Sequence, residues 1–304
     1  MSIQKSLIVV CGPTAVGKTA MAIELASMLG TEILSADSRQ FFRELIIGAA
    51  MPSAEELSAV PHHFIGHLSI QDPYNVSAFE QEALSRIEKL HERHNTLLLV
   101  GGSGLYIDAV CNGIDVLPDP DPNLRLSLKA LMAAEGITAL QEKLLMLDPE
   151  YYKVVDLKNP TRLIRALEVC ITSGQTYTSL RIRKQNPRPF RIIKIGLDLP
   201  KAELMERIRQ RTLAMLECGL EEECRSLLPY RQLNALNTVG YKEMFSYLDG
   251  AITLEEATEK IIVNTWRYAK RQLTWFRRDP EIKWFSKSPA SEIMNEIQPF
   301  INHP

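Results

Sequence analysis

A glycine-bounded loop near the start of the chain carries the residues best suited to chemistry. Residues 12–19 read Gly-Pro-Thr-Ala-Val-Gly-Lys-Thr and fit the pattern G-x-x-x-x-G-K-[ST]. An apolar run at 7–10 precedes the loop, and a helical pattern at 18–29 follows it. A strand, a glycine-rich turn and a helix in that order are the context in which this pattern binds phosphate groups.

Each polar group of the loop has a predicted task. Gly12 and Gly17 let successive backbone N–H groups point at one oxyanion, and the helix N-terminus adds partial positive charge. Lys18 can neutralise the distal phosphate, and the Thr19 hydroxyl can contact Mg²⁺. We therefore predict that a diphosphate or triphosphate with magnesium binds here. The predicted binding residues are Gly12, Pro13, Thr14, Ala15, Val16, Gly17, Lys18 and Thr19.

Carboxylates near the loop are scarce. The apolar run at 97–100 ends in Gly101-Gly102-Ser103-Gly104, where nucleotide-driven motors usually carry an Asp. The nearest carboxylate at a strand end is Asp37, after the run at 32–35. Asp37 could hold magnesium through water, act as a general base, or cap a following helix. The missing carboxylate argues against a motor and leaves a group-transfer enzyme.

The order of apolar runs and helical patterns predicts an α/β fold. The first ~110 residues alternate the two patterns, which indicates a parallel sheet covered on both faces. A Pro/Asp-rich stretch at 117–122 is typical of a hinge, and a strand pattern returns at 190–199. We expect a P-loop NTPase-like core at 1–120 and 186–304, including a helical C-terminal region, with an all-helical insertion at 121–185.

Several capping signals locate helix ends. Gly136 is expected to break a helix over 126–147, and Asn159 is expected to cap a helix that starts at Pro160. Gly219 is expected to end a helix that starts at Leu204, and Thr253 opens a capping box before a long helix to about Arg278.

Composition excludes several classes of protein. The formal net charge of −2 gives no global argument for nucleic acid, and no apolar run approaches the ~18–20 residues of a membrane span. We read no signal peptide, and the odd, irregularly spaced cysteines predict reduced thiols and a cytoplasmic protein. His62, His63 and His67 lack further convergent ligands, so we do not predict a zinc site.

Eight motifs, taken together, resemble the tRNA dimethylallyltransferases, the isopentenyl-tRNA transferase family. They occur in the family's order and cover nearly the whole chain. The matching segments are residues 12–19, Ser35–Gln40, His62-His63, Gly101–Tyr106, Thr161–Ala166, Arg207–Arg211, Val239–Glu243 and Ala269–Phe276.

The resemblance implies transfer of a dimethylallyl group from dimethylallyl diphosphate to N6 of the adenosine 3′ of the anticodon in tRNA. The loop would then hold the diphosphate of the prenyl donor rather than ATP. Asp37 matches the family's general base, Thr19 assists at Mg²⁺ and the leaving group beside Lys18, and Arg211 lies near the diphosphate. The tRNA-contact positions that match are Asp37, Ser38, Arg39, Gln40, Ser103, Arg125, Thr161, Arg162, Leu163, Ile164 and Arg165.

Three alternatives stay open at this point. The first is a related prenyltransferase acting on free adenine nucleotides, and the second is a P-loop small-molecule kinase that consumes ATP. The third is a nucleotide-binding module without chemistry. We expect a monomer. The chain also departs from the family at Met51, Gly66 and Lys242-Glu243, which bears on tRNA affinity rather than on the reaction class.

Two basic segments could contact RNA phosphates or could be solvated surface. Residues 181–194 contain no acidic residue, and phosphate contact is the preferred interpretation there. The second is a helical stripe of Lys260, Arg267, Arg271 and Arg278, for which the two interpretations are equally favoured. We expect Trp266, Trp275 and Trp284 to lie in the core.

Overall fold

A computed structural model describes residues 5–115, 117–119, 121–182 and 186–302. The chain divides into two compact units. The first combines Met1–Cys111 with Pro187–Pro304, and the second is Asn112–Asn186. Within the described residues, no helix is long and apolar enough to cross a membrane.

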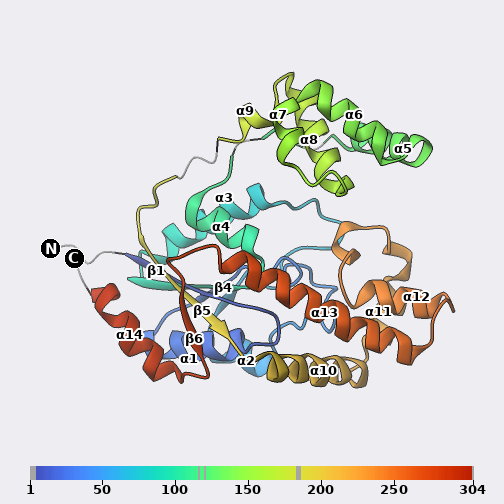
Figure 1. Cartoon of the computed structure of the whole chain (residues 1–304). Helices are drawn as coiled ribbons and strands as arrows, with labels where there is room; N and C mark the ends of the chain where they lie inside the picture. The colour runs from blue at the N-terminus through green and yellow to red at the C-terminus, as the bar shows by residue number, and fades with distance from the viewer. Residues whose placement is uncertain (1–4, 116, 120, 183–185, 303–304) are drawn as a thin grey trace. The chain divides into compact units, whose positions relative to one another are not determined.

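The first unit is built on a six-stranded sheet in which every strand pair is parallel (Figure 1), and the predicted α/β class is confirmed. The strand order is β3-β2-β4-β1-β5-β6. We did not predict β3 and β6, which form the two edges. The strands are β1 Ser6–Cys11, β2 Ile33–Ser35, β3 His62–His63, β4 Thr96–Gly101, β5 Arg191–Asp198 and β6 Lys283–Ser286.

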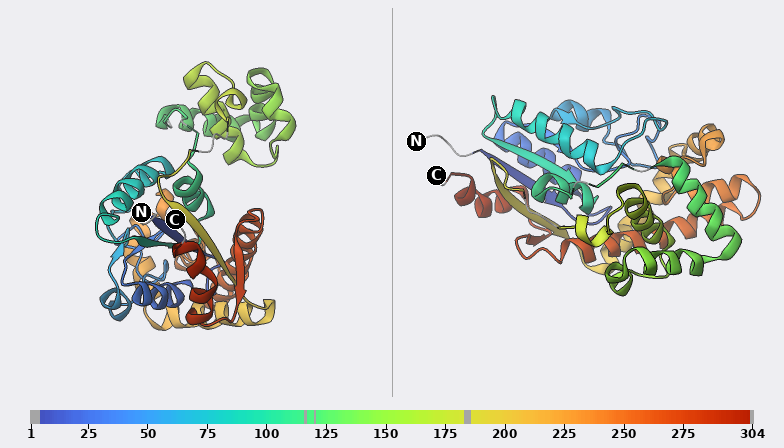
Figure 2. Two further views of the ribbon diagram at one scale, coloured as in Figure 1. Left: turned by 90° about the vertical axis from the view of Figure 1, so that its left-hand side faces the viewer. Right: turned by 90° about the horizontal axis from the view of Figure 1, so that it is seen from above.

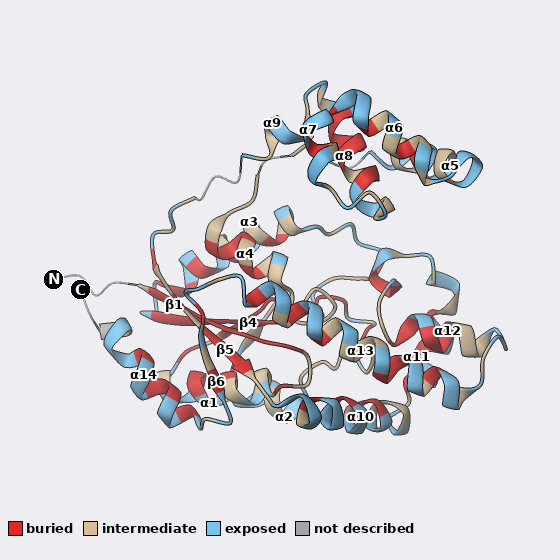
Figure 3. Cartoon of the chain, in the orientation of Figure 1, coloured by how far each residue is buried: buried red, intermediate tan, exposed pale blue. Residues whose placement is uncertain are grey.

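Helices bury both faces of this sheet. Leu7 and Val9 of β1 belong to one apolar cluster, and Ile8 and Val10 belong to the other, as the alternation of a strand requires. Figure 3 shows burial along the strands and on the inward sides of the helices around them. The helices are α1 Lys18–Leu29, α2 Ala54–Ala59, α3 Val76–Leu90, α4 Gly104–Asn112, α10 Lys201–Glu217, α11 Leu220–Leu227, α12 Tyr241–Leu248, α13 Leu254–Phe276 and α14 Ala290–Asn302, with short 3₁₀ turns at Leu228–Tyr230 and Asn234–Leu236.

The predicted capping devices of this unit are confirmed. The Thr253 hydroxyl accepts from the Glu256 N–H, and the Glu256 carboxylate accepts from the Thr253 N–H, which starts α13. After α10, Gly219 has φ 98°, a left-handed conformation that favours glycine. These caps fix the ends of the two helices that bring side chains to the phosphate loop from the C-terminal half.

In the described residues of the second unit, the regular elements are all helices: α5 Pro122–Glu135, α6 Ile137–Leu147, α7 Pro149–Val154, α8 Pro160–Ser173 and α9 Tyr177–Leu180. They gather around a core that includes Leu128, Leu140 and Leu167 (Figure 2). The predicted break at Gly136 and the cap at Asn159 are confirmed.

The first helix of this unit begins earlier than we predicted. The Asp121 carboxylate accepts from the N–H groups of Asn123 and Leu124, and Pro122 occupies the first helical position. The Pro/Asp-rich stretch therefore supplies a helix cap as well as a connection. Its Pro120 lies outside the described residues.

Asp148 is a buried residue that links two helices of the second unit. It is 1% exposed, and its carboxylate accepts from the Tyr151 N–H, the Thr178 N–H and the Thr178 hydroxyl. It thus joins the start of α7 to α9. A buried carboxylate with three donors is stable only while all of them remain in place.

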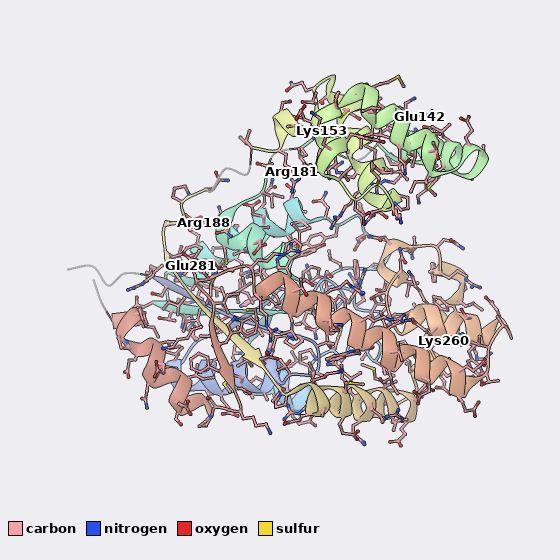
Figure 4. The ribbon with its side chains drawn as sticks, viewed as in Figure 1. Glu142, Lys153, Arg181, Arg188, Lys260 and Glu281 are labelled. Carbon is pink, nitrogen blue, oxygen red and sulfur yellow. The ribbon has the colours of Figure 1, made fainter. Side chains whose placement is uncertain are left out.

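Replacing Asp148 tests the packing of the second unit. Asp148→Ala removes the shared acceptor of three donors, one in a buried and two in half-buried hydrogen bonds, and should lower the free energy of unfolding by about 2–4 kcal/mol. Glu142→Ala on the exposed face of α6, labelled in Figure 4, is the matched control and should change it by less than about 0.5 kcal/mol. Urea unfolding followed by circular dichroism measures both variants, and equal midpoints would contradict the assigned role of Asp148.

Candidate active site at the phosphate loop

A cavity of about 370 Å³ opens beside the phosphate loop. Elements far apart in sequence line it: the loop and the start of α1, the segment after β2, residues 50–52, α10 and α13. The polar lining includes Lys18, Asp37, Arg211 and Gln272. The apolar lining includes Ile33, Met51, Ile65 and Val100. The lining therefore combines charged groups with apolar side chains suited to a small hydrocarbon group.

The loop backbone has the turned conformation that the glycine pattern predicted. Gly12 has φ 148°, and a side chain there would meet the Leu197 carbonyl oxygen of β5 at 2.5 Å from its Cβ. Gly17 has φ 103° and caps α1, while Ala15 has φ 64°. Left-handed residues on both sides of Val16 curl the chain, as a concave anion-binding loop requires.

Lys18 and Arg211 line the cavity together with Asp37. Lys18 Nζ donates to the Pro13 carbonyl at 2.7 Å, and an Arg211 nitrogen lies 3.4 Å from the Thr14 hydroxyl. The pKa of Lys18 is lowered to about 8, chiefly by loss of hydration; Asp37 opposes the shift, and the nearby Arg211 adds to it. Burial also lowers the pKa of Arg211. An incoming anion relieves this unfavourable pairing of like charges.

The Asp37 carboxylate is held at one oxygen. Its Oδ1 accepts from the Arg39 N–H at 3.0 Å, and its backbone carbonyl accepts from the Gln40 N–H at 3.1 Å. These bonds close a turn and no helix follows, so the helix-cap alternative is wrong. Across the described residues, Oδ2 has no hydrogen-bond partner. A free, half-buried carboxylate oxygen beside a cavity can accept a proton.

The residues after Asp37 bond to neighbouring loops. Ser38 N–H donates to Ser103 Oγ at 3.1 Å, which links the segment after β2 to the segment after β4. Gln40 Nε2 donates to the Ala50 carbonyl, and Arg39 donates to the Asn234 carbonyl. The structure therefore brings together Asp37, Ser38, Gln40 and Ser103 near the loop.

Packing explains why the segment after β4 carries no carboxylate. A Cβ at Gly101 would lie 2.3 Å from the Ala36 carbonyl oxygen. A Cβ at Gly104 would lie 2.3 Å from the Trp275 ring. The strand end lies too close to its neighbours to accept an acidic side chain there.

The predicted tRNA-contact block of the second unit is divided by burial. Leu163 and Ile164 are 0% and 6% exposed and pack in the unit's core, so burial excludes their side chains from a surface contact. Thr161 and Arg162 are exposed at the start of α8.

The other two predicted positions of that unit surround a buried acid. Arg125 forms two hydrogen bonds to Glu168, at 2.5 and 2.7 Å, and Glu168 is 1% exposed. Arg165 donates to the Pro118 carbonyl and lies 3.8 Å from the same carboxylate. Arg125 and Arg165 therefore neutralise a buried charge, a task that competes with RNA contact.

The basic segment at 181–194 is largely structural where it is described. Arg188 pairs with Glu80 at 2.6 Å and Lys194 with Asp279 at 2.7 Å, and both cations are nearly buried. The preferred phosphate-contact interpretation is wrong for these two side chains. Arg183 and Lys184 of the same segment lie outside the described residues.

Two histidines of the first unit contact one glutamate carboxylate. His63 Nε2 lies 2.7 Å from a Glu32 carboxylate oxygen, and His94 lies 3.2 Å from the other. Among the described residues, no group of three or more His, Cys, Asp or Glu could hold a metal ion.

Sequence reasoning missed two cavity residues on α13, Tyr268 and Gln272. Their spacing of four places them on one helix face toward the cavity, but neither residue type signals phosphate chemistry. The expectation that Trp275 lies in the core is also wrong, because it is 37% exposed, with its ring N–H bonded to Asp108. Trp266 and Trp284 are half-buried.

Comparisons with known proteins agree over nearly the whole chain. The family model described as IPP transferase matches residues 40–279. The chain is 49% identical to "tRNA dimethylallyltransferase 1" of Phocaeicola vulgatus over 298 residues, covering 98% of this chain and 99% of the relative. It is 50% identical to "tRNA dimethylallyltransferase" of Christiangramia forsetii over 297 residues, covering 97% and 98%. These two matches, unlike the family model, span the phosphate loop and Asp37.

A solved structure gives the same assignment. The full-length tRNA isopentenylpyrophosphate transferase from Bacillus halodurans is 37% identical, with a TM-score of 0.71. The match covers 98% of this chain and 96% of that structure.

The lowered pKa of Lys18 makes anion binding depend on pH. Below about pH 8 the ammonium is already charged; above it, binding must take up a proton, so affinity should fall as pH rises. We expect Mg²⁺-pyrophosphate affinity of the wild type, relative to Lys18→Arg, to fall steadily from pH 8 to pH 9.5. Calorimetry measures both affinities. The ligand's own titration is common to both proteins and cancels in the ratio, and arginine stays charged over this range, so the ratio reports the titration of Lys18. A flat ratio would show that Lys18 does not face the anion.

Proposed function

Because the chain belongs to the IPP transferase family and transfers a dimethylallyl group to tRNA, we propose how its residues divide that reaction. The donor is dimethylallyl diphosphate, and the acceptor is N6 of the adenosine 3′ of the anticodon. The observation that carries the proposal is a single cavity lined by the phosphate loop, a free carboxylate oxygen and apolar side chains.

The donor's diphosphate lies in the loop of residues 12–19. Lys18 and Arg211 are already close to this loop, so they can neutralise charge that grows on the leaving group. Loop N–H groups add oriented donors that need no rearrangement during the reaction. Thr19, in the first turn of α1, would hold Mg²⁺ through its hydroxyl, with diphosphate oxygens as further ligands. When bound, the ion would neutralise leaving-group charge.

Asp37 acts as the general base. The N6 lone pair is delocalised into the adenine ring, so attack is easier when a carboxylate takes the N6 proton as the new bond forms. The C–O bond to diphosphate breaks, the C–N bond forms, and the proton moves to Oδ2 of Asp37. The Arg39 N–H on Oδ1 keeps the carboxylate oriented during this step.

The alternatives are less well supported. A prenyltransferase on free nucleotides or an ATP kinase would need no tRNA, whereas the relatives are named for tRNA. Production of labelled tRNA from labelled dimethylallyl diphosphate tests the proposal directly. ATP consumption without label transfer would support the kinase instead.

In the second unit, the proposed tRNA contact is the exposed start of α8. Thr161 and Arg162 follow the cap at Asn159 and Pro160, so the Thr161 N–H, its hydroxyl and a guanidinium lie near one another. Such a set suits an RNA phosphate.

A second proposed contact is the exposed face of α13. Residues 260–278 contain no Asp or Glu, and their cations are Lys260, Arg267, Lys270, Arg271, Arg277 and Arg278. Of these, Arg277 pairs with Asp198 at 2.7 Å. Within the described part of the chain, the others have no carboxylate within 4.0 Å.

Aromatic rings accompany these cations. Arg271 lies over the Tyr268 ring, which lines the cavity, and Arg278 lies over the half-exposed Trp275 ring. Figure 4 labels Lys260, which lies nearer the N-terminus of the same helix. In a chain of net charge −2, this acid-free face beside the cavity suits the phosphates of a nucleic acid.

Asp37→Asn tests the general base. The variant should lose prenyl transfer by roughly 10²–10⁴-fold, because the amide cannot accept the N6 proton. Pyrophosphate affinity should be kept or increase, since the carboxylate repels an anion. Single-turnover transfer and calorimetry separate the two effects. The control is Asp249→Asn, whose surface carboxylate pairs with Arg231. Wild-type transfer by Asp37→Asn would remove the base assignment.

Two adjacent arginines test the α13 surface. Arg278→Gln should weaken tRNA binding roughly three- to tenfold near 0.1 M salt, and should reduce the magnitude of the log–log salt slope by about one. Arg277→Gln removes the same charge from a side chain already paired with Asp198 and should have a smaller effect. Filter binding across salt concentrations measures both. Equal losses for the two variants would mean that general charge, not a contact at Arg278, attracts the RNA.

A further inference from the structure

We propose that Gln272 is a positioning residue that fixes the donor-binding loop against the loop that holds the acceptor side of the site. The inference rests on the proposed function, and it adds a residue to which no role in the reaction has been given above. Gln272 lies on α13 and is 6% exposed. Its amide bridges two backbone segments that are far apart in sequence.

The bridge has a defined polarity. Gln272 Oε1 accepts from the Thr14 N–H at 2.8 Å, and Nε2 donates to the Gly102 carbonyl at 2.8 Å. Both partners are backbone groups, one a donor only and the other an acceptor only, so only one orientation of the amide satisfies them. No hydrocarbon side chain of similar length can replace it.

The bridge is one link in a longer chain of contacts. Thr14 belongs to the loop that holds the diphosphate. Gly102 precedes Ser103, whose hydroxyl accepts from the Ser38 N–H, next to the proposed base Asp37. Gln272 therefore connects the donor side of the cavity to the acceptor side through three hydrogen bonds joined by short backbone segments. Because transfer needs a short, aligned approach of carbon to nitrogen, such a connection should set the rate.

The local sequence makes room for this amide. A Cβ at Gly102 would lie 2.2 Å from Gln272 Nε2, so any larger residue there must displace the bridge. The helix itself has other anchors: Ile262, Ala269 and Phe276 are buried in the apolar clusters. α13 therefore docks without the amide, and the bridge contributes position rather than the bulk of the fold's stability.

Removing the bridge should lower turnover more than donor binding. Gln272→Met keeps the volume but leaves the Thr14 N–H and the Gly102 carbonyl unpaired. We expect kcat for transfer to tRNA to fall roughly 10–100-fold while KM for dimethylallyl diphosphate changes less than about threefold. Gln298→Met, on the exposed face of α14, is the control and should behave as the wild type. Unchanged kcat, or a loss confined to KM, would overturn the inference.

A carboxyl variant gives a readout that a purely structural role would not move. In Gln272→Glu, the protonated acid can accept from Thr14 and donate to Gly102, but the ionised form opposes the Gly102 carbonyl with negative charge. Activity relative to the wild type at the same pH should therefore rise several-fold as pH falls from 9 to 6. Gln298→Glu is the control for the added charge. A flat ratio over this range, together with wild-type kcat in Gln272→Met, contradicts the bridge.

A double-mutant cycle supplies an independent check. Gly102→Ala displaces the amide from the other side, so alone it should lower kcat by a factor similar to that of Gln272→Met. The double variant should be little worse than either single one, because both break the same contact. Multiplied losses would contradict a shared bridge. If the wild type itself transfers no label to tRNA, the proposed function fails; if it does while Gln272→Met keeps full turnover, only this inference fails.

Discussion

Holding two cations together in one small cavity is the constraint on which the rest of the site depends. Lys18 comes from the start of α1 and Arg211 from α10, and neither is paired with an acid. Burial and the repulsion from Arg211 lower the pKa of Lys18, and Asp37 opposes this shift only in part. The apolar clusters on both sheet faces hold these helices in place against that repulsion. An electrostatically strained pair of this kind favours a multiply charged anion over neutral ligands.

Much of this architecture could be predicted because its signals are local. The phosphate loop, the capping box at Thr253 and the helix break at Gly136 depend on neighbouring residues whose backbone preferences are strong. The edge strand β3 has only two residues and no periodicity, so its pairing with β2 follows from tertiary contact alone. The first insertion helix begins early because Asp121 caps it. We interpreted the segment around Asp121 as a hinge because of its prolines, and so missed this cap.

Side-chain roles were harder to predict, because they depend on partners distant in sequence. Glu168 lies 43 positions from Arg125, and Gln272 lies 258 from Thr14. A basic segment in the sequence cannot reveal that Arg188 is buried against Glu80. By contrast, the absence of acid between residues 260 and 278 is visible in the sequence and leaves most of those cations unpaired in the structure. Residues 181–194 lack acid as well, so a local absence of acid does not by itself separate a paired basic segment from an unpaired one.

The position of β1 has a consequence for biosynthesis. It pairs with β4 on one side and with β5 on the other, and the whole helical unit lies between those two strands in the chain. During translation, the edge of β1 that pairs with β5 therefore stays unpaired while the second unit emerges from the ribosome. Arg211 and Gln272 appear later still. A nascent chain thus gains a complete phosphate site only near the end of synthesis. Until then, the unpaired strand edge exposes folding intermediates to aggregation, against which chaperones protect.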